Sequence, residues 1–192
     1  MDPAATKKIE AIVIGVSAGG LEALSMILSA LPMHFPLPIA IVQHRAKDDN
    51  SLLEDVLETK CRIKIKQADE KETIRGGIVY FAPANYHLLV EKDHSFSLSG
   101  GIFENYSRPS IDVLFETAAD TYKDKLLGII LTGASNDGAK GILTIQKQGG
   151  LTIAQDPNEA KYPFMPKAAI DLGGVTHILN LKEIIEFLLK MI

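Results

Sequence analysis

IVIGVSAGGLEALSMIL, residues 12–28, joins a short apolar run to a helix-like segment through a glycine-flanked serine. A strand that ends in such a turn and continues as a helix places the Ser17 hydroxyl beyond the edge of a sheet. The free N–H groups and the dipole of the helix favour negative charge beside that hydroxyl. This arrangement suits acyl transfer, in which an oxyanion must be held. A glycine-rich turn without chemistry has the same pattern.

The rest of the chain alternates apolar runs with amphipathic segments. The predicted buried strands are Ile12–Gly15, Pro38–Gln43, Leu127–Leu131, Leu151–Ala154 and His177–Leu179. The predicted helices are Leu21–Ala30, Leu52–Thr59, Ile111–Tyr122, Ala139–Gln148, Pro166–Leu172 and Lys182–Met191. Continuous Ile, Val and Leu runs are typical of strands that are buried on both faces, and their alternation with helices predicts right-handed parallel crossovers.

The middle of the chain has a different pattern. Short runs separated by turn signals predict antiparallel hairpins, inserted in the sheet or added to its edge, at Ile63–Gln67, Ile78–Phe81, Tyr86–Val90 and Ser95–Leu98. No linker, repeat or low-complexity tract divides the chain. We therefore expect one α/β domain, a doubly wound and mostly parallel open sheet with helices on both faces and an antiparallel hairpin region in the middle.

The composition of the chain excludes several classes of function. The chain has 192 residues, of which 46% are hydrophobic and 23% are charged, as in ordinary globular domains. A net charge of −4 gives no broad electrostatic attraction to nucleic acid. No apolar run approaches the roughly 20 residues that span a bilayer, and the N-terminus lacks a signal-peptide core. One cysteine, Cys61, excludes an internal disulfide, and a cytoplasmic location is expected. Nothing around Cys61 indicates an activated nucleophile.

Three chemically active side chains follow three predicted parallel strands. Ser17 follows the first, His44 follows the second, and Asp137 lies in the loop after the run Leu127–Leu131. Ligands of open parallel sheets bind beyond the carboxyl ends of the strands. A nucleophile, a general base and an orienting carboxylate are therefore expected at one edge. Individually, His44 is compatible with an ordinary hydrogen-bonded histidine, and Asp137 with a helix N-cap.

From about Ile12 to about Leu179 the chain resembles the catalytic domain of the bacterial chemotaxis protein-glutamate methylesterases of the CheB type. The resemblance rests on an ordered set of motifs, which is more specific than any one of them. These motifs are Ile14-Gly15-Val16-Ser17-Ala18-Gly19-Gly20, Val42-Gln43-His44, Tyr80-Phe81-Ala82-Pro83, Arg108-Pro109-Ser110-Ile111-Asp112-Val113-Leu114-Phe115, Leu131-Thr132-Gly133, Asn136-Asp137-Gly138-Ala139-Lys140-Gly141, Thr152-Ile153-Ala154-Gln155-Asp156 and Met165-Pro166.

The resemblance implies hydrolysis of glutamate γ-methyl esters on chemoreceptor helices, and deamidation of some receptor glutamines. It places the catalytic triad on Ser17, His44 and Asp137. Candidates for the oxyanion hole and for substrate contacts are Ala18, Gly19, Ala134, Asn136 and Arg108. No metal or organic cofactor is implied. The family pattern has Met-Gly where this chain has Ala134-Ser135, so the shape of the pocket is expected to differ.

These enzymes commonly carry an N-terminal phospho-receiver domain. Residues 1–192 are expected to form a single methylesterase-like catalytic domain without one, because few residues precede the first predicted strand. Its partners are then methylated chemoreceptor helices, and its activity is expected to be either constitutive or controlled by a separate regulatory protein.

Two other functions fit parts of the sequence. A dinucleotide-binding domain requires a glycine where Ser17 stands and an acidic residue near the position of His44 and Arg45. A non-catalytic signalling module would keep the fold and only bind partners. The Ala134-Ser135 change favours that module, whereas an intact triad argues against it. Nucleotide binding would support the first alternative, and covalent labelling of Ser17 by a serine-directed phosphonate would argue against the second.

Overall fold

The computed structural model describes residues 8–44 and 53–192. The strands in these ranges are β1 (Ala11–Val16), β2 (Ile39–Gln43), β3 (Lys64–Gln67), β4 (Ile78–Phe81), β5 (His87–Val90), β6 (Phe96–Ser99), β7 (Leu126–Ile130), β8 (Leu151–Gln155) and β9 (His177–Leu179). The helices are α1 (Gly20–Ala30), α2 (Leu53–Glu58), α3 (Ile111–Tyr122), α4 (Ala139–Lys147), α5 (Phe164–Asp171) and α6 (Leu181–Leu189), with a 3₁₀ turn at Lys123–Lys125.

The main sheet has seven parallel strands in the order β3-β4-β2-β1-β7-β8-β9. Strand β1 lies at its centre, where Val13 pairs with Ala40 of β2 on one side and with Gly128 of β7 on the other. The chain builds one half of the sheet from β2, β4 and β3 and the other half from β7, β8 and β9. The direction of winding therefore changes at β1, where open sheets of this kind bind ligands.

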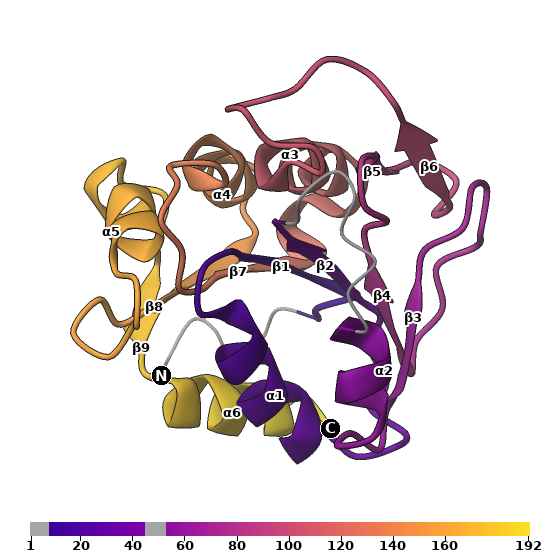
Figure 1. The fold of residues 1–192 in the computed structure, drawn as a ribbon, viewed down its shortest axis with the longest axis horizontal. Coiled ribbons are helices and arrows are strands. Elements are labelled where there is room, and N and C mark those ends of the chain that lie inside the picture. Colours follow the sequence, from indigo (N-terminus) through magenta and orange to yellow (C-terminus); the bar gives the residue numbers. More distant parts are fainter. Residues whose placement is uncertain (1–7, 45–52) are drawn as a thin grey trace.

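Helices cover both faces of this sheet (Figure 1). Helices α1, α2 and α6 lie on one face, and α3, α4 and α5 lie on the other. Each layer buries its own apolar cluster, one built around Leu24, Ile27 and Ile184 and the other around Leu114, Phe115 and Ile142. Burial on both faces explains why the central strands β1, β2, β7 and β8 consist mostly of Ile, Val, Leu and Ala. The predicted fold class is confirmed.

The prediction for the middle of the chain was half right. Strands β5 and β6 form a separate antiparallel pair, as expected. Strands β3 and β4 were expected to be antiparallel but run parallel, and they form one edge of the main sheet. Residues 68–77 carry the chain back between them and pair with the β6 region, since the Phe96 N–H donates to the Glu72 carbonyl at 2.9 Å. A connection of this length permits a parallel return, which a tight hairpin does not.

Three neighbouring strands and one helix terminus converge at the site edge. The carboxyl ends of β2, β1 and β7 lie side by side, and the segments after them carry His44, Ser17 and Asp137. The start of α3 packs against this edge because Gly15 has no side chain, and a Cβ there would collide with Ile111. The fold therefore brings the first turn of α3 to the ends of the central strands.

Candidate active site

Ser17 lies in the turn between β1 and α1, half-buried. Its backbone N–H donates to the Thr132 carbonyl at 3.0 Å, and its carbonyl accepts from the Gly20 N–H at 2.9 Å. The N-cap residue of α1, Gly19, has φ 77°, a left-handed conformation that favours glycine. The sharp turn predicted from the sequence is thus held by backbone contacts to the neighbouring strand end.

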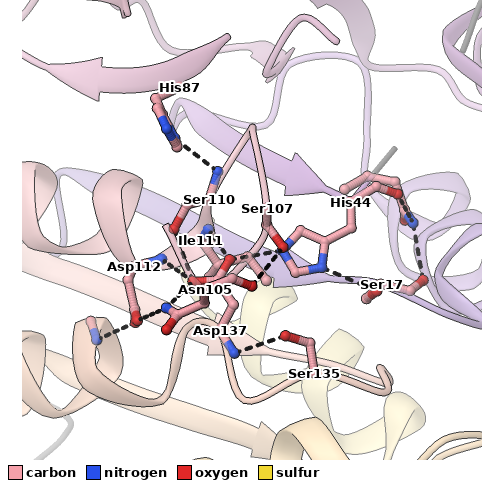
Figure 2. Close-up of polar contacts among 12 residues, drawn as sticks. Ser17, His44, His87, Asn105, Ser107, Ser110, Ile111, Asp112, Ser135 and Asp137 are labelled. Carbon is pink, nitrogen blue, oxygen red and sulfur yellow. Dashed lines mark hydrogen bonds and ion pairs between the residues drawn. The ribbon is translucent and has the colours of Figure 1, made fainter. Parts of the chain in front are cut away.

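His44 directly follows β2 and links the other two residues (Figure 2). Its Nδ1 lies 3.2 Å from the Ser17 Oγ, and its Nε2 lies 2.7 Å from the Asp137 Oδ2. The His44 N–H donates to the Val16 carbonyl at 3.1 Å, which ties the strand ends together. Because an ionised carboxylate only accepts, the neutral imidazole carries its proton on Nε2, and Nδ1 is left to accept from Ser17.

Asp137 is fully buried and does not cap the helix that follows it in sequence. The N-cap of α4 is Gly138, without a side-chain cap. The carboxylate lies instead at the start of α3, where it accepts from the N–H groups of Ile111 at 2.7 Å and Asp112 at 3.2 Å. The Ser110 hydroxyl donates to it at 2.9 Å. Asp137 therefore binds the N-terminus of a helix, as the helix-cap alternative expected, but that helix is α3 and not α4.

The electrostatics of Asp137 follow from these contacts. Burial alone would raise its pKa, but the hydrogen bonds from His44 and from the Ile111 N–H outweigh burial and hold the pKa below its usual value. The positive end of the α3 dipole acts in the same direction. Asp137 is therefore ionised at neutral pH, as an orienting carboxylate for a histidine base must be.

Side chains that the sequence reasoning missed hold the Ser17 turn. The Gln43 Nε2 donates to the Ser17 carbonyl at 3.0 Å. The Thr132 hydroxyl donates to the Ala18 carbonyl at 3.0 Å and accepts from the Tyr162 N–H at 2.9 Å. Gln43 and Thr132 stand within motifs noted in the sequence, but their partners are 26 and 114 residues away, respectively. Only the fold identifies these contacts.

The oxyanion candidates lie in two loops beside Ser17. The N–H groups of Ala18 and Gly19 stand at the start of α1 and donate to no acceptor within residues 8–44 and 53–192. Ala134 is exposed in the loop after β7, as is Asn136, whose carbonyl accepts from the Ala139 N–H at 3.2 Å. Unpaired N–H groups at a helix start suit an anion.

Arg108, the remaining candidate for a substrate contact, is bound to its own loop and to Asn85. Its guanidinium donates to the Asn85 Oδ1 at 2.6 and 3.1 Å, and to the carbonyls of Gly100 at 2.8 Å and Gly101 at 2.5 Å. It also stacks over the Phe103 ring at 4.5 Å. These recorded contacts anchor the loop before α3 and do not include Ser17, His44 or Asp137.

An open cavity of about 870 Å³ leads to the Ser17 hydroxyl. Its walls come from the Ser17 turn, the outer face of α1, the end of β2 and two lysines, Lys60 and Lys161. Lys161 lies 3.7 Å from the Glu22 carboxylate across the mouth, and both side chains are exposed. The cavity is thus a surface groove with mixed apolar and charged walls, wide enough for a side chain presented by another protein.

The described residues hold neither a cluster of metal-binding side chains nor a membrane-spanning helix. No group of three or more His, Cys, Asp and Glu side chains in residues 8–44 and 53–192 is arranged to hold a metal ion. In the same ranges, every helix is too short or too polar to cross a membrane.

The comparisons with known proteins agree with this geometry. The CheB methylesterase family model matches residues 12–188. A putative protein-glutamate methylesterase/protein-glutamine glutaminase of Leptospira interrogans is 53% identical over 95% of this chain and 94% of its own length. A protein-glutamate methylesterase/protein-glutamine glutaminase of Carboxydothermus hydrogenoformans is 41% identical over 91% of this chain, which spans 53% of that protein.

A solved structure gives the same result. The crystal structure of the Thermotoga maritima CheB methylesterase catalytic domain superposes with a TM-score of 0.91, at 34% identity, over 96% of this chain and 100% of that domain. The agreement covers both helix layers and the whole sheet rather than one motif. This chain therefore belongs to the CheB methylesterase family.

Proposed function

We propose that this chain is a serine hydrolase that removes methyl groups from glutamate γ-methyl esters on chemoreceptor helices, with deamidation of glutamine side chains as a second activity. Both activities are those for which the relatives are named. The observation that carries the proposal is the hydrogen-bonded series Ser17–His44–Asp137, with contacts of 3.2 and 2.7 Å. The seven-stranded sheet, with one apolar cluster on each face, supports one catalytic domain.

The first half of the reaction is acyl transfer to the enzyme. Ser17 Oγ attacks the ester carbonyl while its proton passes to His44 Nδ1. The ionised Asp137 stabilises the imidazolium that forms and fixes the orientation of the ring. The tetrahedral intermediate collapses as the C–O bond to the methoxy group breaks, and the proton on Nδ1 passes to that group to release methanol.

The second half frees the enzyme. A water molecule gives a proton to His44 Nδ1 and attacks the acyl carbonyl, and the bond to Ser17 Oγ breaks with return of the proton. The product is a glutamate side chain. With glutamine as substrate the leaving group is ammonia, and the other steps are the same.

The oxyanion is held by backbone N–H groups in this proposal. Ala18 and Gly19 supply two candidates at the start of α1, and Ala134 supplies a third from the loop after β7. Each well-placed donor contributes about 3 kcal/mol to transition-state stabilisation. An N–H donor needs no particular side chain, so alanine at position 134 retains this contribution.

The alternatives are less well supported. Family membership argues against a dinucleotide-binding domain, and Ser17 and His44 stand where that domain has a glycine and an acidic residue. A non-catalytic module would have no need for a buried carboxylate aimed at a histidine that contacts a serine. The triad geometry therefore favours the hydrolase.

The direct test is substitution of the nucleophile. In Ser17→Ala, methanol release from methylated receptor should fall by several powers of ten, on the order of 10⁶-fold, with an unchanged circular dichroism spectrum. Ser29→Ala, at an exposed serine of α1, the helix that follows Ser17, is the matched control and should keep wild-type turnover. Near-normal turnover in purified Ser17→Ala would reject Ser17 as nucleophile.

A further inference from the structure

Two buried carboxylates lie side by side next to His44. Asp137 is fully buried, and Asp112, in the first turn of α3, is 6% exposed. The side-chain amide of Asn105 bridges them, with its Nδ2 at 3.1 Å from the Asp137 Oδ1 and 2.8 Å from the Asp112 Oδ2 (Figure 2). An amide nitrogen carries two hydrogens, so it donates one to each carboxylate without adding charge.

The other contacts of the pair supply little compensating positive charge. Asp112 Oδ1 accepts from the Gly141 N–H at 2.7 Å. In the described part of the chain, His44 is the one basic side chain within ion-pair distance of either carboxylate. Glu116 lies near enough to Asp112 for the two charges to interact, and the other charged groups that act on Glu116 are Lys140, Asp120 and Glu104, so the charges on this side of Asp112 are mostly acidic.

We propose that Asn105 is a positioning residue for the Ser17–His44–Asp137 triad. By binding Oδ1 of Asp137, its amide keeps Oδ2 turned toward His44, and by binding Asp112 at the same time it holds the two carboxylates apart. This inference rests on the proposed function of those three residues.

The electrostatics support this role. Burial, together with the charge of Asp137, raises the pKa of Asp112, and the hydrogen bond from Asn105 opposes that rise. Without the bridge, Asp112 takes up a proton more readily and becomes a donor that competes for Asp137. The orientation of the carboxylate toward His44 would then no longer be fixed.

The backbone offers a matched set of variants. Asn105 has φ 48° and its neighbour Tyr106 has φ 61°, both in the left-handed region that favours glycine and asparagine. Asn105→Gly therefore removes the amide and keeps the backbone conformation. Tyr106→Gly makes the same backbone change at a fully exposed side chain that contacts neither carboxylate. Asn105→Asp keeps the size of the side chain but replaces the donor with an acceptor.

The experiment measures the rate at which a fluorophosphonate probe labels Ser17, followed by intact-protein mass spectrometry across pH. Ser17 Oγ attacks phosphorus, fluoride leaves, and the proton passes to His44. We expect Asn105→Gly to be slower on the order of ten- to a hundredfold, the cost of a misplaced catalytic group. Tyr106→Gly should label at the wild-type rate.

Asn105→Asp gives a readout that a purely structural role would not. The new carboxyl lies between two others, which raises its pKa, and it donates a hydrogen bond only while protonated. Wild-type labelling should rise with pH, because only a neutral imidazole accepts the Ser17 proton, whereas labelling of Asn105→Asp should rise and then fall. If Asn105→Gly is unstable in thermal melts, the pH profile of Asn105→Asp tests the proposal instead.

The outcomes separate the two proposals. Failure of the wild type to label would reject the proposed function. Normal labelling of the wild type, with wild-type rates and pH profiles in both Asn105 variants, would overturn the role of Asn105 alone. An equal loss of rate in Tyr106→Gly and Asn105→Gly would also overturn it, because the loop backbone and not the amide would then matter.

Discussion

The His44 ring presents Nδ1 to Ser17 and Nε2 to Asp137, so its neutral form needs the proton on Nε2. Asp137 enforces that tautomer because its carboxylate only accepts. The same carboxylate accepts N–H groups from the start of α3 on both oxygens. Asp137 thereby links the proposed base to the N-terminus of α3. Each of these contacts requires that its side chain accept a hydrogen bond.

Asp137→Asn tests this point without changing the size of the side chain. Either orientation of the new amide puts an NH₂ group against N–H donors, at His44 and Ile111 or at Asp112 and Asn105. We expect turnover to fall by about 10⁴-fold, the typical effect of losing the correct tautomer, and the measurement is steady-state methanol release. Retention of a tenth or more of wild-type turnover would mean that His44 does not depend on Asp137.

At the scale of single residues, the sequence predicted which three side chains come together at the strand ends, but not the residues that hold them. Ser17, His44 and Asp137 follow strands, and strand ends can be recognised from apolar runs. Asn105, in a loop, and Gln43, at the end of β2, bond to residues 32 and 26 positions away, respectively, and no periodic pattern in the sequence links such distant positions. Arg108 matched a family motif, yet its guanidinium is bound within its own loop and to Asn85. A motif identifies a residue type, and only the fold determines what it contacts.

At the scale of elements, close packing of α3 against α4 fixes where Asp112 and Asp137 lie. The contact is made at Gly141 of α4, where a Cβ would lie 2.5 Å from the Phe115 Cβ and 3.1 Å from the Asp112 Cα. Neither atom can move by a side-chain rotation. The helices meet at this distance only because position 141 has no side chain.

Gly141→Ala should therefore separate the two helices. Alanine favours a helix over glycine by about 1 kcal/mol, but overpacking a buried contact costs roughly 1–3 kcal/mol, and a clash with backbone lies toward the upper end. We expect a net loss of unfolding free energy in urea titrations, together with reduced turnover because the start of α3 moves. Gln146→Ala, at an exposed position of α4, is the control. A variant as stable as the wild type would contradict this packing argument.

The connections between elements explain why the direction of strands β3 and β4 was mispredicted. The runs that became β3 and β4 show the burial of strands, but an isolated apolar run carries no direction. Direction was settled by residues 68–77, which are long enough to return parallel and which bond to the β6 region. The helices, by contrast, were predicted closely, since Ile111–Tyr122 carries a clear apolar face that ends at Lys123, whose φ is positive.

At the scale of the whole molecule, activity and stability depend on different ionisations. His44 must be neutral to accept the Ser17 proton. The pKa of Asp137 is held below 3.8, so its stabilising contribution is present above its unfolded pKa and is lost only as pH falls through the lower folded value. The pKa of Asp112 is raised, so the folded state binds that proton more readily than the unfolded chain, and stability increases as pH falls through the raised value.

Acidification from neutral pH should therefore inactivate the enzyme before it unfolds. Protonation of His44 removes the base, whereas loss of the Asp137 contribution requires a pH below 3.8, and protonation of Asp112 opposes destabilisation on the way. The measurement pairs methanol release with far-ultraviolet circular dichroism and thermal melts across the acidic range. Activity should fall through a single ionisation while the spectrum stays native, and it should return in full at neutral pH. If the thermal midpoint falls in parallel with activity, or the lost activity does not return, then unfolding, and not protonation of His44, causes the loss of activity at acidic pH.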